Sequence, residues 1–343
     1  MINEAAILFD EGSELNQLNA STERGRLLFS QVQNRVVKVN PHFPKLPLKL
    51  EQGKSCSLGL FADSELKNGI SMEVWEGHGR SALLGRVAFA DDEDNIYRDI
   101  DLKGAGYIKF SADGRAIVGR PGIFGADDWG LTNLDEALRD YEIHEEFVTA
   151  GIRTDRIIGV IGLEEIVVNG IKMPCQQAID ELILREGFKP SLEVRAFVTK
   201  ARVQDLVSRN NRAPLFLEDA KKIAARELGK DETIPDEDYV FWFAGNLGVN
   251  IGKMHKKGWV HTNLSDQNIT VDCRIVDLDT VENIYDGDEK KVNDFKNGQR
   301  SIRNLLSHIG QIRIREDEHS PSLVTSLAAF EKRFIEAYEL AAK

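Results

Sequence analysis

Short runs of apolar residues in the first two thirds of the chain predict β-strands. The runs cover residues 71–75, 81–89, 96–103, 157–161, 166–168 and 192–198. The second and third runs are joined by the acidic segment 91–95, so this pair predicts a β-hairpin. Residues 134–150 interrupt the series with apolar residues at helical spacing, and Gly151 can end that helix.

The pattern changes after about residue 205, where longer amphipathic segments replace the short runs. Residues 217–228 and 239–257 predict helices, and the second carries apolar side chains expected on one side: Phe241, Ala244, Leu247, Ile251 and Met254. A strand-rich front half and a helix-rich back half predict an α+β protein with two lobes that meet near residues 205–215. Ahead of them, residues 1–30 predict a polar lead-in with a short helix, and residues 31–65 predict irregular structure with short strands.

Composition limits the function classes. The chain has 343 residues, 42% of them hydrophobic, and a net charge of -12, which disfavours tracking along a nucleic-acid backbone. No apolar run is long enough for a membrane span. The three cysteines are widely spaced and the N-terminus is acidic, so we expect reduced thiols and a cytoplasmic location, with leaderless export as the alternative.

The stretch His261-Thr-Asn-Leu-Ser-Asp-Gln-Asn-Ile, followed by Ile-Val-Asp-Leu-Asp at 275–279, resembles the catalytic and metal loops of a protein-kinase-like fold. In such a fold Asn268 and Asp277 would supply the oxygen ligands of a divalent metal ion. His261 is expected to support the loop. Asn263 stands where a kinase loop has its catalytic Asp, and an amide cannot accept a proton as a carboxylate does.

A second set of motifs points to one family. Leu102-Lys-Gly-Ala-Gly, Asp113-Gly-Arg-Ala, an Arg-containing helix with a Glu, Gly151-Ile-Arg-Thr-Asp-Arg and Gly79-Arg-Ser-Ala-Leu-Leu-Gly occur in series. The chain resembles the selenoprotein O family, also called YdiU, whose members are kinase-like protein adenylyltransferases. The resemblance covers about residues 65–285.

The resemblance implies a nucleotide site. Lys103 would contact a phosphate, and Glu145 would hold the Lys103 side chain, with the neighbouring Glu146 as the alternative. The remaining nucleotide-contacting candidates are arginines and one glycine: Arg80, Gly104, Arg115, Arg195 and Arg202. A plain salt bridge or a surface role is the alternative for each arginine.

The resemblance also implies transfer of AMP from ATP, with Mg²⁺ or Mn²⁺, to Ser, Thr or Tyr of a protein substrate, and pyrophosphate as the leaving group. The family has an Asp directly before its metal-binding Asn, but this chain has Gln267 there and Asp266 one position earlier. Asp266 is therefore the candidate general base. The chain is shorter than typical relatives and carries an insertion at 122–133, for which a substrate-ordering segment and a lid are the alternatives.

These expectations combine into one hypothesis. Residues 1–65 form an N-terminal extension, 66–208 a kinase-like N-lobe of mostly antiparallel β-structure, and 209–343 a helical C-lobe with the catalytic and metal loops. The leading function is ATP-dependent protein AMPylation, with other proteins or the chain itself as acceptor and with no nucleic acid or membrane partner. A phosphate-transferring kinase and an inactive nucleotide-binding module are the alternatives.

Overall fold

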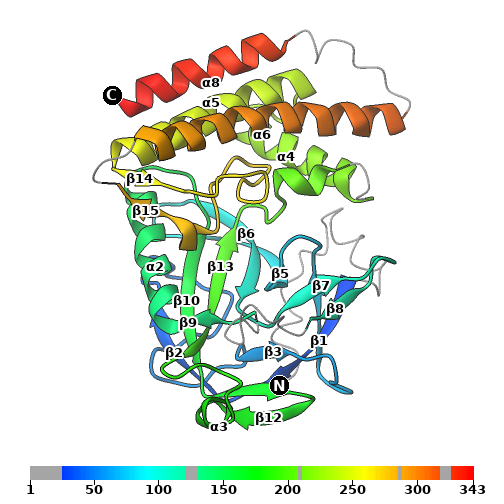
Figure 1. Ribbon diagram of the computed structural model, residues 1–343. Coiled ribbons are helices and arrows are strands. Elements are labelled where there is room, and N and C mark those ends of the chain that lie inside the picture. Colours follow the sequence, from blue (N-terminus) through cyan, green and yellow to red (C-terminus); the bar gives the residue numbers. More distant parts are fainter. Residues whose placement is uncertain (1–24, 120–129, 208–210, 285–287, 317–325) are drawn as a thin grey trace. The chain divides into compact units, whose positions relative to one another are not determined.

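The computed structural model describes residues 25–119, 130–207, 211–284, 288–316 and 326–343 (Figure 1). Contacts along the chain divide it into two units. The first unit contains residues 1–142 and 156–198, and the second contains residues 143–155 and 199–343. The predicted domain boundaries at 65/66 and 208/209 stay predictions.

The first unit is built around a nine-stranded sheet with the order β2-β10-β13-β6-β5-β4-β1-β3, and β9 pairs with β13. The pairs in it are antiparallel. Its strands are β1 (Arg26–Gln31), β2 (Asn34–Val39), β3 (Leu60–Ala62), β4 (Ile70–Val74), β5 (Ser81–Ala90), β6 (Ile96–Lys103), β9 (Thr132–Asn133), β10 (Arg156–Leu163) and β13 (Pro190–Phe197). Two small hairpins and a helix complete the unit: β7 (Ile108–Phe110) with β8 (Ala116–Val118), β11 (Glu165–Val168) with β12 (Ile171–Pro174), and α3 (Cys175–Asp180).

The central strands of this sheet are buried along most of their length. All eight residues of β13 are buried, and so are the last five residues of β6. A strand that is buried on both faces reads as a near-continuous apolar run, so the charged residues within β6 and β13 stand out against their neighbours. The helix α2 (Leu134–Thr149) packs Ala137 and Tyr141 of its first half against Ile157 and Val160 of β10.

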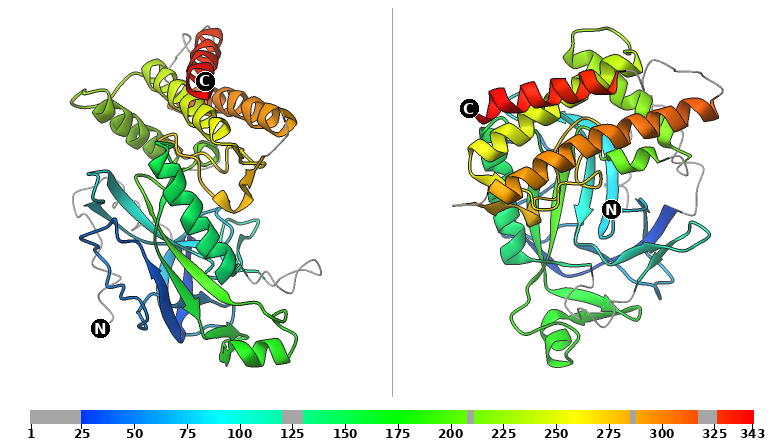
Figure 2. Two further views of the ribbon diagram at one scale, coloured as in Figure 1. Left: turned by 90° about the vertical axis from the view of Figure 1, so that its left-hand side faces the viewer. Right: turned by 45° about the horizontal axis from the view of Figure 1, so that its top comes forward.

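The second unit is mainly helical. Its elements are η3 (Val203–Leu206), α4 (Ala213–Glu227), α5 (Asp236–Lys256), β14 (Trp259–Val260), η4 (Leu278–Thr280), β15 (Glu282–Asn283), α6 (Asp288–Arg315) and α8 (Leu327–Ala342). The long helices α5, α6 and α8 lie side by side in the views of Figures 1 and 2. Phe295 of α6 meets Phe334 and Tyr338 of α8, with ring centroids 5.1 and 4.8 Å apart.

Glycines on α5 allow the close approach of α8. A Cβ placed on Gly248 would lie 2.4 Å from the carbonyl oxygen of Phe334, and one on Gly252 would lie 2.7 Å from that of Tyr338. Both contacts are with backbone atoms, which cannot swing aside, so any larger residue would push the helices apart.

The α+β class is confirmed: one unit carries the mostly antiparallel sheet and the other most of the long helices, which is consistent with a kinase-like two-lobed fold. The predicted hairpin is β5–β6, and the predicted helices are α2, α4 and α5 within a few residues. Phe241 is a correction, because its side chain is 46% exposed while the other four residues of the predicted α5 stripe are buried. At 100° per residue it lies well off the centre of that stripe.

Three predictions concern the chain ends and the loops. The lead-in prediction is wrong from Arg26 onward, where β1 begins. The short helix predicted for this segment stays a prediction, because residues 1–24 lie outside the described residues. Residues 122–129 of the insertion and 208–210 of the lobe junction also lie outside them. None of the helices in the described ranges has the length and apolar character needed to cross a membrane.

Candidate functional site

The loop that follows α5 is held in place by a buried histidine. Gly258, with φ of 81°, ends the helix, and β14 leads into His261, whose exposure is 0%. The His261 backbone N–H donates to Oδ2 of Asp294 on α6 at 2.8 Å, and its ring Nε2 lies 2.9 Å from the carbonyl oxygen of Val276. One side chain therefore ties together the start of the loop and the strand-like segment that follows it. The expected supporting role of His261 agrees with these contacts.

The two predicted metal ligands lie next to each other. The N–H of Val276, the residue before Asp277, donates to the backbone oxygen of Asn268 at 3.0 Å, and Ile269 and Ile275 form an antiparallel bridge. Asp277 has φ 66° and ψ 55°, a left-handed conformation that non-glycine residues adopt rarely and often at functional positions. The fold thus brings together two residues nine positions apart in the sequence.

The side chain of Asn268 suits a metal ligand. It is 3% exposed, and its Nδ2 donates to the backbone oxygen of Asn263 at 2.9 Å. That bond orients the amide and leaves its oxygen as a candidate hard ligand for a metal ion. Mg²⁺ is commonly held by one or two protein oxygens, with phosphates and water completing its shell. Across the described ranges, no cluster of three or more His, Cys, Asp and Glu side chains could hold a metal ion.

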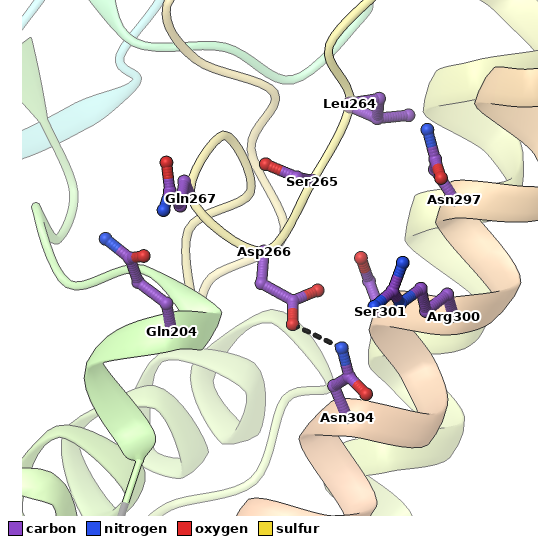
Figure 3. A pocket seen from close by; sticks show the side chains of 9 residues that line it. All are labelled: Gln204, Leu264, Ser265, Asp266, Gln267, Asn297, Arg300, Ser301 and Asn304. Carbon is purple, nitrogen blue, oxygen red and sulfur yellow. Dashed lines mark hydrogen bonds between the residues drawn. The ribbon is translucent and has the colours of Figure 1, made fainter. Parts of the chain in front are cut away.

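Asn263 and Asp266 occupy different environments within this loop. Asn263 is exposed. Asp266 is half-buried, and its Oδ2 accepts a hydrogen bond of 2.6 Å from Nδ2 of Asn304 on α6 (Figure 3). The carboxylate proposed as general base therefore faces a helix of the same unit. Its catalytic role stays a prediction.

Arg202 lies beside the metal loop. Its backbone forms an antiparallel bridge with Thr270, and the next residue, Val203, donates to the oxygen of Ile269 at 2.9 Å. The Arg202 side chain is largely buried, with 6% of the residue exposed. The second unit thus places the backbone of this arginine next to the residues that follow Asn268. Its contact with a nucleotide stays a prediction.

Lys103, at the end of β6, is buried among carboxylates of the first unit. Its Nζ lies 3.3 Å from Asp140 of α2 and 3.5 Å from Glu193 of β13, and Lys103 and Glu193 are cross-strand neighbours. Burial, opposed by the Lys103 charge and reinforced by that of Asp140, raises the pKa of Glu193 to about 7. The sequence reasoning missed both carboxylates. A charged residue inside an otherwise apolar strand, as Glu193 is, was the available signal.

Arg195 also has a buried carboxylate partner. It pairs in a bidentate manner with Asp101 across the β13–β6 ladder, with both N–O distances 2.8 Å. Gly104, at φ 93°, donates its N–H to the backbone oxygen of Arg80 at 2.9 Å, so these two predicted residues are adjacent. Arg115 is exposed and pairs with Asp113 at 3.1 Å. Phosphate contacts by these four residues stay predictions.

Glu145 and Glu146 lie on the part of α2 that belongs to the second unit. Glu145 is half-buried, whereas Glu146 is exposed and accepts a hydrogen bond of 2.8 Å from the Trp259 indole. This contact gives Glu146 a role in packing α2 beside the start of the loop. Glu145 stays the residue predicted to hold Lys103, with Glu146 as the alternative.

Sequence comparison connects these motifs to known proteins. The chain is 35% identical over 100 residues to the protein nucleotidyltransferase YdiU of Bradyrhizobium sp. (strain BTAi1 / ATCC BAA-1182). The matched region covers 29% of this chain and 16% of that protein. It is 26% identical over 206 residues to the protein of the same name from Pseudoalteromonas translucida. This match covers 59% of this chain and 37% of that protein. The YdiU protein of Rhodopseudomonas palustris (strain BisB5) is 36% identical over 94 residues, which is 27% of this chain and 15% of that protein.

No family model matches the chain. The matched regions span between 15% and 37% of the length of these curated relatives. Within those limits, the resemblance to the selenoprotein O (YdiU) family is confirmed by relatives that carry the name protein nucleotidyltransferase.

Proposed function

We propose that this protein is an ATP- and metal-dependent nucleotidyltransferase that transfers AMP to hydroxyl side chains of protein substrates. The observation that carries the proposal is the adjacency of Asn268 and Asp277 in a loop ordered by His261, in a chain similar to proteins named nucleotidyltransferases. An amide oxygen and a carboxylate at one place suit a divalent cation that is also bound by phosphates.

Each predicted site residue has its own role in this proposal. Asn268 and Asp277 would hold Mg²⁺ or Mn²⁺, which would neutralise charge on the nucleotide phosphates. Lys103 would contact a phosphate, and Asp140 and Glu193, both within 3.5 Å of its Nζ, limit the positions that its ammonium group can take. Arg202 would supply a planar fork for phosphate oxygens.

Asn263 favours AMP transfer over ordinary phosphate transfer, whereas Gln267 departs from the AMP-transferring family. Asn263 and Gln267 are amides where a carboxylate would be expected of a kinase and of the resembled family, respectively. The same two amides favour the second candidate function, a nucleotide-binding module without transfer activity. Kinase activity is the third possible outcome, and all three predict different fates for the phosphates of ATP.

Paired incubations with labelled ATP separate the candidates. The protein is incubated with Mn²⁺ or Mg²⁺, a mixture of Ser-, Thr- and Tyr-containing peptides, and ATP labelled at either the α- or the γ-phosphate. Covalent label from α-labelled ATP alone, with release of pyrophosphate, is the expected result. Label from γ-labelled ATP alone would establish phosphate transfer, and a thermal shift with ATP and metal but no covalent label would establish the binding module.

A matched pair of variants tests the metal site. Asp277→Asn should reduce label incorporation at least 100-fold, because it replaces a charged metal ligand by a neutral one of the same shape. Asp279→Asn makes the same chemical change two residues away and should leave incorporation within about threefold. Equal activity of Asp277→Asn and the parent protein would overturn the metal assignment.

A further inference from the structure

A polar pocket lies between the loop and α6 within the second unit. It has a volume of about 280 Å³ and is lined by residues 264–267 of the loop, Gln204, and four residues of α6, which are Asn297, Arg300, Ser301 and Asn304 (Figure 3). We name it the α6 pocket. It begins immediately before Asn268, so the same loop supplies one wall of the pocket and one predicted metal ligand.

The most buried polar side chain that lines the α6 pocket lacks a hydrogen-bond partner among the described residues. Ser301 is 1% exposed, and its Oγ has no hydrogen-bond partner among the described residues. A helical serine usually bonds to the carbonyl one turn earlier or points to water. A buried hydroxyl with neither costs free energy. Figure 3 shows Ser301 on the face of α6 that is turned to the loop. This hydroxyl is therefore available to a group that enters the pocket.

The wall of the pocket is fixed by a side-chain bond. Asn304 donates to Asp266 at 2.6 Å, which spans the gap between α6 and the loop. This bond occupies one of the two N–H donors of Asn304 and one oxygen of the carboxylate. The remaining polar lining is rich in neutral amides, from Gln204, Gln267 and Asn297. Amides can both donate to and accept from a peptide backbone.

The rim of the pocket carries one cation. Arg300 is exposed, and no ion pair is formed between it and any residue in the described part of the chain. Arg303, in the next turn of α6, instead pairs with Glu331 at 2.6 Å. Burial lowers the pKa of His308, which is near enough to Asp266 to sense its charge, so this histidine adds no permanent positive charge. Arg300 is the group at the rim that can attract an anion.

We propose that the α6 pocket binds the protein acceptor, as a short segment with a small polar side chain that reaches Ser301 and an acidic side chain that meets Arg300. The volume is just below that of typical small-molecule sites, and its exposed rim residues, Arg300 and Gln267, suit an extended chain lying across the opening. The role of the bound segment as acceptor rests on the proposed transferase function. Binding of the segment to the pocket does not depend on that function.

Binding is measured without nucleotide. Three fluorescent dodecapeptides share one sequence around a central Ser and differ only in its two neighbours, which are Glu, Gln or Lys. Anisotropy titrations of the parent protein should give the tightest binding for the Glu peptide, at least tenfold tighter than for the Lys peptide, and Ser301→Ala should weaken it at least threefold.

Charge reversal on α6 supplies the matched comparison. Arg300→Glu should reverse the order of the Glu and Lys peptides. Arg303→Glu makes the same charge change three residues away on the same helix and should preserve the order. Equal binding of all three peptides to the parent protein, or equal effects of the two charge reversals, would overturn the pocket assignment.

The transfer assay separates failure of this inference from failure of the proposed function. If the peptides bind as expected but take no label from α-labelled ATP, the pocket stands and the transferase proposal falls. If the peptides are labelled equally whatever their flanking charge, and Arg300→Glu changes nothing, the transferase proposal stands and the pocket falls.

Discussion

Replacing Ser301 by alanine should stabilise the protein while weakening its binding of an acceptor. The serine hydroxyl is buried in α6 without a partner, and an unsatisfied buried hydroxyl costs about 1–3 kcal/mol. Alanine removes that cost and also has the better helix propensity, by about 0.5 kcal/mol. The change deletes only one oxygen atom, so it leaves little cavity.

The matched control is Ser307→Ala. Ser307 lies in the same helix, is exposed, and has its Oγ 3.4 Å from the Gln311 amide. This variant gains the same helix propensity but removes no buried hydroxyl. The difference in the free energy of unfolding between the two variants therefore measures the cost of the orphaned group, and we expect about 1 kcal/mol or more in favour of Ser301→Ala.

Urea unfolding followed by circular dichroism gives this difference directly, provided that the slope of free energy against urea is unchanged. In a thermal melt the same difference should raise Tm by about 2–4 °C for each kcal/mol in a unit of this size. If Ser301→Ala is less stable than Ser307→Ala, the hydroxyl has a partner within the fold. The Ser301 hydroxyl would then not be a free contact for a ligand in the α6 pocket.

Three further predictions concern other parts of the molecule. Gly248→Ala should lower the free energy of unfolding by about 1–3 kcal/mol in urea titrations, because its Cβ would meet the backbone of α8. The control is Gly310→Ala on α6, where an added Cβ meets no atom within 4 Å; it should raise the free energy of unfolding by up to about 1 kcal/mol. The raised pKa of Glu193, about 7, means that the folded protein binds a proton more tightly than the unfolded chain between about pH 4.5 and 7. Stability should fall as the pH rises through that window, and Glu193→Gln should flatten the profile; an identical slope in both proteins would refute the assignment. Asp277→Gly should keep the melting temperature within about 2 °C, because glycine accepts the left-handed conformation at φ 66°, yet it should abolish nucleotide transfer; full retention of transfer would remove Asp277 from the metal site.

The spacing of apolar residues was sufficient to predict secondary structure where that spacing was strong and regular. The β5–β6 hairpin follows from two apolar runs around an acidic turn, and α2 from its helical spacing and Gly151. The pattern failed at β1, whose six residues are stabilised by pairing with β3 and β4, about 30 to 47 residues away in the chain. Such long-range pairing leaves no signal in the strand itself.

The helix α6 was missed although it has a signal. Its buried residues Ile302, Leu305, Ile309 and Ile312 recur at helical spacing. The many charged residues around them conceal that stripe in a reading of composition. This omission concealed the α6 pocket as well, because four of its lining residues lie on this helix.

Only part of the candidate site was predictable from the sequence, because some of its contacts depend on how distant segments pair. The pairing of Asn268 with Asp277 follows from motif order and resemblance, since no spacing rule alone brings residues 268 and 277 together. The partners of Lys103 and Arg195 were not predicted. Their carboxylates, Glu193 and Asp101, lie opposite them on neighbouring strands, and only the register of the sheet reveals those pairs.

The position of the loop carboxylate links the chemistry to the pocket. In the resembled family an Asp directly precedes the metal-binding Asn, but here the carboxylate is one residue earlier, at Asp266, and it bonds to Asn304. A proton acceptor must reach the proton it removes. If Asp266 is the general base, the acceptor hydroxyl has to approach it through the α6 pocket. Asn304→Leu, which removes the hydrogen bond at similar volume, should then alter the KM for the acceptor peptide more than the KM for ATP. An equal effect on both would separate Asp266 from acceptor binding.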